Sequence, residues 1–183
     1  MVQKSFWSRL LSVSLELLRS LAIVFLFAFI IRYFLIQPFI VEGSSMEPNF
    51  HDREFILINK ISYQLYAPKR FDVVVFRNPR DPSVFFIKRI IGLPGENVKI
   101  ENDQIYINGT ILTENFISSQ SETLISDSKL NVLDITLGAN ELFVLGDNRD
   151  ESLDSRELGP LKKINIVGKY WFALYPFNYS RSP

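Results

Sequence analysis

Residues 84–112 carry the strongest structural signal in the chain and read VFFIKRIIGLPGENVKIENDQIYINGTIL. Short runs of β-branched and aromatic residues alternate here with turn residues, a pattern typical of β-strands. Asn108-Gly109 separates the runs 104–107 and 110–112. This pair predicts a two-residue hairpin turn, because both of its central positions require a positive φ. The Gly-Leu-Pro-Gly sequence at 92–95 ends an earlier run in a similar way.

The same alternation continues through most of the chain beyond residue 50. No stretch there keeps a helical period over three turns. Residues 114–131 are rich in Ser, Thr, Asn and Asp, so we expect a long surface loop or excursion. We therefore predict a mainly β domain of coiled antiparallel sheets. The predicted strands cover residues 55–59, 72–76, 84–91, 98–100, 104–107, 110–112, 141–145 and 164–175.

The N-terminal part has a different composition. Between residues 10 and 41 the chain is dominated by Leu, Ile, Phe, Val and Ala, and only Glu16, Arg19 and Arg32 are charged. A helix needs about 20 apolar residues to cross a bilayer, and the two arginines lie near enough to the ends to snorkel. We predict one transmembrane helix over residues 14–36, ended by Pro38, with residues 1–13 before it and the β domain at 37–183 after it.

The charges on either side of this span predict its orientation. Basic flanks stay in the cytoplasm, so we expect residues 1–13 to be cytoplasmic and residues 37–183 to lie outside. A cleavable signal peptide is the alternative, but the apolar stretch is long and no small-x-small cleavage site follows it. Lys4, Arg9 and Arg19 precede or enter the span, whereas Glu42, Glu47, Asp52 and Glu54 follow it.

Composition excludes several classes of function. The chain has 183 residues, 20 Lys and Arg against 20 Asp and Glu, one His and no Cys. This balance argues against a nucleic-acid partner, which would call for a basic face. Thiol chemistry, disulfides, cysteine zinc sites and multi-histidine metal centres are excluded. A hydrolytic mechanism would have to use hydroxyls, carboxylates, lysine or His51.

The first segment that could carry chemistry is Gly43-Ser44-Ser45-Met46-Glu47-Pro48. Ser44 and Glu47 have the spacing of a helix capping box, although Pro48 weakens that interpretation. A turn of small residues could equally hold a serine hydroxyl exposed, next to a backbone N–H that could bind an oxyanion. The segment alone favours a plain turn or cap over a catalytic serine.

The second segment is Phe85-Phe86-Ile87-Lys88-Arg89-Ile90-Ile91. Apolar residues on both faces of this strand predict that it is buried, and a desolvated lysine has a lowered pKa. A neutral Lys88 amine could accept a serine proton, although both cations could instead snorkel or pair with acids. His51 lies six residues after Ser45, but its charged neighbours indicate a wet loop, so we favour Lys88 as the base.

The third segment is Gly146-Asp147-Asn148-Arg149-Asp150-Glu151-Ser152-Leu153-Asp154-Ser155-Arg156, directly after the predicted strand at 141–145. A calcium loop starting at Asp147 is disfavoured, because Arg149 takes a ligand position and Ser152 replaces the required glycine. A solvated turn is a second possibility. The density of hydrogen-bonding groups favours a buried or half-buried network that orients other residues.

These three segments, in this order behind an N-terminal anchor, resemble the type I signal peptidases. Those are membrane-bound serine proteases that remove signal peptides from exported proteins. Residues 43–48 look like the family's serine box, 70–76 like its strand motif, 86–95 like its lysine box, and 146–156 like its Gly-Asp-Asn-Arg-Asp box. The resemblance implies a mostly β catalytic domain with a variable excursion.

The resemblance also implies a Ser/Lys dyad. Ser45 matches the nucleophile, Lys88 the general base, and Ser152 the serine that hydrogen-bonds and positions the lysine amine. The Ser45 backbone N–H would contribute to the oxyanion hole. Asp154, Arg156 and Asp147 match residues that hold the site together, and Met46 is expected near the pocket for the small residue at the cleavage site.

The implied partners are exported preproteins with small residues, typically Ala, at the first and third positions before the cut. They would bind as an added strand at a groove edge, near membrane lipid. No metal or organic cofactor is implied. The implied location is a bacterial cytoplasmic membrane, with a thylakoid membrane as the alternative. A self-cleaving or dedicated-partner Ser/Lys protease and a non-catalytic, membrane-tethered peptide-binding domain are the competing hypotheses.

The chain departs from the family pattern in three places. Gly43 stands where some members carry a serine whose hydroxyl completes the oxyanion hole, and Ser44 cannot simply replace it, since its side chain leaves the backbone elsewhere. Asn49 replaces a frequent threonine, and Phe71 replaces a usual glycine. The first departure concerns the oxyanion hole, and the other two do not touch the dyad.

Overall fold

The computed structural model describes residues 6–117 and 132–175, and the chain divides into two units, Met1–Gln37 and Pro38–Pro183. In the first unit, helix α1 (Phe6–Ile30) continues into a short π-helix, η1 (Ile31–Leu35). Residues 10–29 have a mean hydropathy of 2.0, and in the described part of the chain this is the one helix long and apolar enough to cross a membrane.

The helix is longer at its start than the sequence predicted. It begins at Phe6 and not at Ser14, because residues 6–13 contain no glycine or proline that would stop it. Its end agrees better with the prediction, since the helical backbone stops at Leu35, three residues before Pro38. Proline restricts the residue before it to extended conformations, so the chain continues as a strand.

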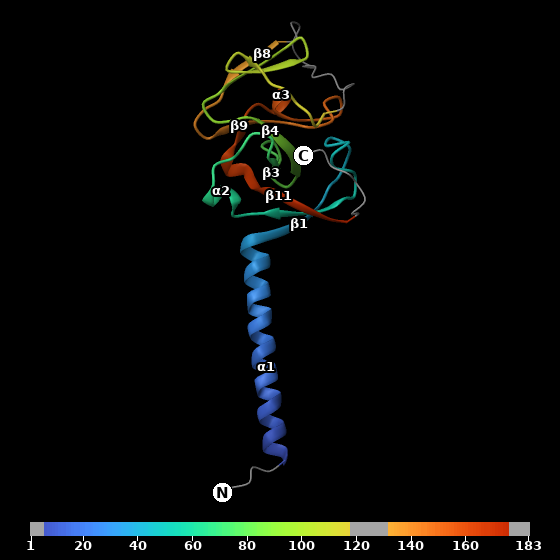
Figure 1. Ribbon diagram of the computed structural model, residues 1–183, viewed down its shortest axis with the longest axis vertical. Helices are drawn as coiled ribbons and strands as arrows, with labels where there is room; N and C mark the ends of the chain where they lie inside the picture. The colour runs from blue at the N-terminus through green and yellow to red at the C-terminus, as the bar shows by residue number, and fades with distance from the viewer. Residues whose placement is uncertain (1–5, 118–131, 176–183) are drawn as a thin grey trace. The chain divides into compact units, whose positions relative to one another are not determined.

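The second unit is mainly β, as predicted, and consists of two sheets (Figure 1). Every pairing with a defined register is antiparallel. The larger sheet has the order β1 (Ile36–Ile40), β2 (Phe55–Asn59), β11 (Ile166–Tyr175), β3 (Val73–Arg77), β4 (Phe85–Gly92), β9 (Glu141–Leu145) and β10 (Leu161–Lys162). The smaller sheet has the order β7 (Thr110–Ile111), β6 (Gln104–Ile107), β5 (Asn97–Glu101) and β8 (Val132–Thr136).

Strand β4 has a free edge over half its length. Its residues Phe85–Arg89 pair with β3 on one side, whereas pairing with β9 on the other side covers only Arg89 to Gly92. In the part of the chain that the structure describes, Phe85–Lys88 therefore have no strand partner on that second side. An unpaired strand edge offers backbone donors and acceptors to an extended peptide.

Three clusters of buried apolar residues form the core. One joins the two sheets, since Val98 and Ile100 of β5 pack with Ile91 of β4 and with Phe143 and Leu145 of β9. Figure 1 accordingly shows the smaller sheet beside β4 and β9. The second cluster includes Met46, and the third holds the apolar side chains of the opposite face of β3, β4 and β9. Strand β4, which carries Lys88, is thus held by apolar packing on both faces.

The predicted strands are present with small shifts at their ends, and the hairpin has its expected turn. Asn108 and Gly109 have φ values of 50° and 80°. Register shifts within β11 bend the larger sheet. Outside the predicted strands the structure adds β1, β8 and β10, and one-turn helices at α2 (Ser62–Leu65) and α3 (Ser155–Leu158). The short helix η2 (Lys163–Asn165) takes the first two residues of the strand predicted at 164–175, so that β11 begins at Ile166.

The excursion predicted at 114–131 needs a partial correction. Residues 118–131 lie outside the described residues. Asn115 is exposed, but the two residues on either side of it are not on the surface, because Phe116 belongs to the core and the Glu114 side chain is 7% exposed. Their burial follows from partners distant in sequence, which the polar composition of the stretch does not indicate.

Candidate active site

The structure brings Ser45 and Lys88 together. Ser45 lies in the turn that follows β1, and Lys88 projects from β4. The Lys88 amine donates a hydrogen bond to Ser45 Oγ, with 2.6 Å between the two atoms. Proton transfer between a nucleophile and its base requires contact at about this distance.

The surroundings of Lys88 favour its neutral form. The residue is 3% exposed. Burial lowers the pKa of Lys88 from 10.5 to about 8, against the charges of Asp154 and Asp147, which raise it, while Arg156 lowers it. The Phe86 ring lies 5.5 Å from the amine, a contact that favours the charged form and does not add to the effect of burial. A primary amine with this pKa can act as a base near neutral pH.

The segment after β9 holds the nucleophile turn by its backbone. The Asn148 N–H donates to the Ser45 carbonyl at 3.1 Å, and its side-chain amide donates to the Ser44 carbonyl at 3.3 Å. Gly146 lies so close that an added Cβ would come within 2.5 Å of the Ser45 carbonyl and 2.2 Å of Ser152 Oγ. Only a residue without a side chain fits there.

Asp154 and Arg156 form a buried pair on the same segment. Asp154 caps α3 by accepting from the Arg156 N–H, and its carboxylate also accepts from the Arg156 guanidinium and from the Gly146 N–H. Arg156 in turn donates to the carbonyls of Arg149 and Ser152. These bonds fix the loop that supports Ser45, as predicted for a network that orients other residues.

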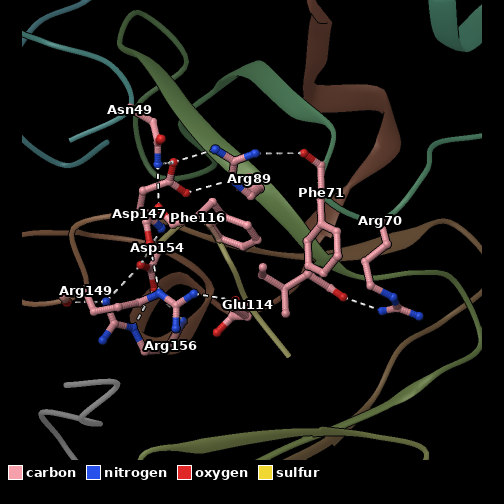
Figure 2. A network of polar contacts seen from close by, with 12 residues as sticks. Asn49, Arg70, Phe71, Arg89, Glu114, Phe116, Asp147, Arg149, Asp154 and Arg156 are labelled. Carbon is pink, nitrogen blue, oxygen red and sulfur yellow. Dashed lines mark hydrogen bonds and ion pairs between the residues drawn. The ribbon is translucent and has the colours of Figure 1, made fainter. Parts of the chain in front are cut away.

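Asp147 joins this segment to β4. Its buried carboxylate accepts two hydrogen bonds from Arg89, at 2.8 and 2.6 Å, and one from the Asn49 amide at 2.9 Å (Figure 2). Asn49 also donates to the Phe116 carbonyl. Arg89 lies over the Phe116 ring, 4.2 Å from its centroid. Four separate segments therefore meet at one buried charge pair.

A third buried ion pair joins Arg149 to Glu114 (Figure 2). Arg149 also donates to the Gly146 carbonyl, beside the glycine that contacts the nucleophile turn. The sequence did not identify Asn49, Arg89, Glu114 or Arg149 as functional residues. The sequence did contain an indication for Arg89 and Arg149. Each is a charged residue within a segment predicted to be buried, and buried charges need partners.

Two predicted site residues are not placed as expected. Ser152 Oγ is buried, but in the described residues it has no hydrogen-bond partner, so the predicted bond to Lys88 is not formed here. Its hydroxyl packs against Gly146, and the Lys88 amine contacts Ser45. Met46 is completely buried in the core and does not line the groove described below, because apolar residues surround it on all sides.

The structure also describes the contacts of Gly43 and Ser44, which lie where an oxyanion hole was expected. Gly43 has a φ of 85°, and its N–H donates to Asp52. The Ser44 hydroxyl donates to Glu151, so in this structure it does not replace the serine missing at position 43.

His51 is associated with Glu54, whose carboxylate accepts from the His51 backbone N–H. Lys88, favoured over His51 from the sequence, is the residue that contacts Ser45.

A groove of about 850 Å³ opens beside the dyad. Its walls are residues 38–45, which run from β1 into the turn that holds Ser45, and residues 83–88, which include the free edge of β4. Most of its lining is apolar, and Ser45 and Lys88 contribute to it. In residues 6–117 and 132–175, no group of three or more acidic or imidazole side chains is arranged to hold a metal ion.

The chain is similar to several known proteins. A family model described as signal peptidase, peptidase S26, matches residues 14–175. Signal peptidase I S of Bacillus subtilis (strain 168) is 37% identical over 172 residues, covering 91% of this chain and 92% of the relative. A signal peptidase I of Bacillus amyloliquefaciens is 37% identical over 171 residues, covering 91% of each. A crystal structure of a signal peptidase I from Enterococcus faecalis V583 covers 57% of this chain and 97% of its own, with 33% identity and a TM-score of 0.46.

Proposed function

Because the chain belongs to the signal peptidase family, peptidase S26, we propose that it cleaves preproteins with a Ser45/Lys88 dyad. It is a serine peptidase that removes signal peptides. The observation that supports the dyad is the 2.6 Å hydrogen bond between a buried lysine amine and a serine hydroxyl at the end of an apolar groove.

In the proposed reaction the neutral Lys88 amine accepts the Ser45 proton as Oγ attacks the carbonyl carbon of the scissile bond. The negative charge that forms on the carbonyl oxygen is stabilised by the Ser45 N–H. Lys88 then donates the proton to the leaving amine, and Ser45 retains the signal peptide as an ester. A water molecule gives a proton to Lys88 and attacks the ester carbonyl. As the ester bond breaks, Lys88 returns this proton to Ser45 Oγ, and the signal peptide leaves with a free carboxyl group.

The proposed positioning residues are Asp154, Arg156 and Asp147. Their hydrogen bonds hold the backbone of the segment that contacts the turn with Ser45. The proposed role of Ser152 is to position the Lys88 amine once a substrate displaces the contacts seen here. Met46 supports the groove from within the core, since Val41, Ile56, Val75 and Ile87 pack with it and line the groove.

The groove supports the proposed substrate preference. An extended peptide can pair with the free edge of β4 as an added strand. Alternate side chains of such a strand point toward the apolar wall. Residues at the first and third positions before the cut share one face, which supports a preference for Ala at both.

The test compares wild type with Ser45→Ala, Lys88→Ala and Lys88→Arg on a precursor carrying Ala at both positions. Wild type should cut after the second Ala, and all three variants should lose turnover, because a guanidinium stays charged and cannot act as a base. Product masses locate the cut, and a Lys60→Arg variant controls for the substitution itself. Full turnover by Lys88→Ala and Lys88→Arg would rule out the dyad. No cleavage by folded wild type would favour a dedicated-partner protease or a binding domain.

The chain is a single-pass membrane protein through its N-terminal apolar helix. We propose that residues 1–13 are cytoplasmic and that the catalytic domain lies outside, in a bacterial cytoplasmic membrane. The distribution of basic residues before the span supports this orientation. The short connection from helix to Ser45 would keep the nucleophile near the bilayer, where signal peptides present their cleavage sites.

A further inference from the structure

Glu151 differs from the two buried acids of the segment that supports Ser45, and unlike the exposed Asp150 it lines the groove. Asp147 and Asp154 are buried and are paired with arginines. Glu151 is exposed, and it lines the groove together with Ser44, Ser45 and Lys88. Within the described residues its carboxylate makes no ion pair, so its charge is not compensated by a neighbouring cation.

The lining of the groove has a net negative charge when Lys88 is neutral. Its titratable lining consists of Glu42, Lys88 and Glu151. Lys88 must be neutral to accept a proton, which leaves two carboxylates and no cation in the lining. A cleft that carries one sign of charge between apolar walls concentrates the electric field on whatever binds there.

The carboxylate of Glu151 is held at a defined place. It accepts a hydrogen bond from the Ser44 hydroxyl, one residue before the nucleophile. A substrate whose scissile carbonyl reaches Ser45 must therefore bring its flanking residues close to this charge. Ala is expected at the first position before the cut, so the variable residues nearest Glu151 are the second residue before the cut and the first residue after it.

We infer that Glu151 makes the enzyme select against acidic residues, and in favour of basic ones, directly beside the cleaved bond. This inference rests on the proposed function and adds a specificity-determining residue to it. The substrates it favours are preproteins with a basic or neutral residue at one or both of these two positions.

The experiment measures kcat/KM for precursors that carry Lys, Gln or Glu at each of the two positions in turn. Wild type is compared with Glu151→Gln, which removes the charge and keeps an oxygen that can accept from Ser44. The matched control is Glu157→Gln, which removes the same charge from an exposed residue of α3 that does not line the groove. All measurements use the full chain in lipid or detergent.

At one or both positions we expect wild type to prefer Lys over Glu by about fivefold, which is the range of a partly screened charge pair. Glu151→Gln should bring this ratio near one, Glu157→Gln should leave it unchanged, and raising the salt concentration should lower it in wild type. An equal Lys-to-Glu ratio in wild type and Glu151→Gln at both positions would overturn the inference. The Gln precursors test the proposed function separately, because failure to cleave them would contradict that function and the inference with it.

Discussion

Gly146 is the residue at which backbone packing bears most directly on the proposed chemistry. A Cβ at this position would collide with the Ser45 carbonyl and with Ser152 Oγ, both within 2.5 Å. We expect Gly146→Ala to lower kcat/KM by about 100-fold, because a nucleophile displaced by about 1 Å loses its alignment. The free energy of unfolding should fall by about 1–3 kcal/mol from overpacking.

Steady-state kinetics and thermal unfolding test this expectation together. Gly138→Ala is the control, since its Cβ would meet only the flexible carboxylate end of Glu141, at 3.1 Å. Wild-type turnover in Gly146→Ala would mean that the close approach does not position Ser45.

The pKa of Lys88 predicts how the rate depends on pH. Burial lowers this pKa to about 8, and the base is active only without its proton. Below pH 8 most of the enzyme carries a charged Lys88 and is inactive, so kcat/KM should rise with pH and level off above about 8. A profile of kcat/KM from pH 6 to 10 checks this. A rate that is flat or falls across this range would exclude Lys88 as the base in the free enzyme.

Single residues were predictable where the chemistry needed a particular residue type in a recognisable context. Ser45 and Lys88 meet this condition, and the structure joins them by a hydrogen bond. Asn49 and Glu114 could not be found in this way, because their partners lie 98 and 35 residues away and no local pattern announces such a contact. Met46 was expected near the substrate pocket from the resemblance, and its apolar side chain is completely buried in the core.

Two chain segments are joined by the buried ion pair of Glu114 and Arg149, and this contact predicts a large effect on stability. The Arg149 side chain is fully buried. Glu114→Gln would leave its charge without this counter-ion, and we expect the free energy of unfolding to fall by about 3 kcal/mol. Glu114→Gln combined with Arg149→Met should cost less than the sum of the two single changes, since neither charge is then left alone.

Chemical denaturation measures these differences. The exposed pair of Lys99 and Glu101 supplies the control, with both side chains more than a third exposed. Glu101→Gln should change stability by less than about 0.5 kcal/mol. Equal effects of Glu114→Gln and Glu101→Gln would show that the buried pair does not hold the 114–117 segment.

The strands that the sequence predicted share alternating or continuous apolar runs and end at turn residues. Strand β8 was missed because it directly follows the polar stretch 114–131, and its side chains are exposed or only half-buried. Strand β1 was not predicted, because Ile36 was assigned to the end of the membrane helix and Pro38 interrupts the short run that follows. Hydropathy alone cannot separate an apolar strand from the end of an apolar helix.

In the whole molecule, the proposed function requires that the catalytic domain and its preprotein substrates meet on one side of the membrane. The charge that Glu151 and Glu42 give the groove is the same in either orientation of the chain. It therefore does not predict on which side of the membrane the catalytic domain lies. The orientation depends instead on the basic residues before the span, Lys4, Arg9 and Arg19, since cytoplasmic flanks retain Lys and Arg.

Protease treatment of intact bacterial spheroplasts tests this orientation. With residues 37–183 outside, added protease should digest the catalytic domain without permeabilisation, while a cytoplasmic marker protein stays intact. Replacing Lys4 and Arg9 with Gln removes two of the three basic residues and should raise the protected fraction, because the charge bias that orients the span is weakened. A domain that is protected in wild type until the membrane is permeabilised would reverse the proposed topology. It would also place the Ser45 and Lys88 site on the side where signal peptides have not yet crossed.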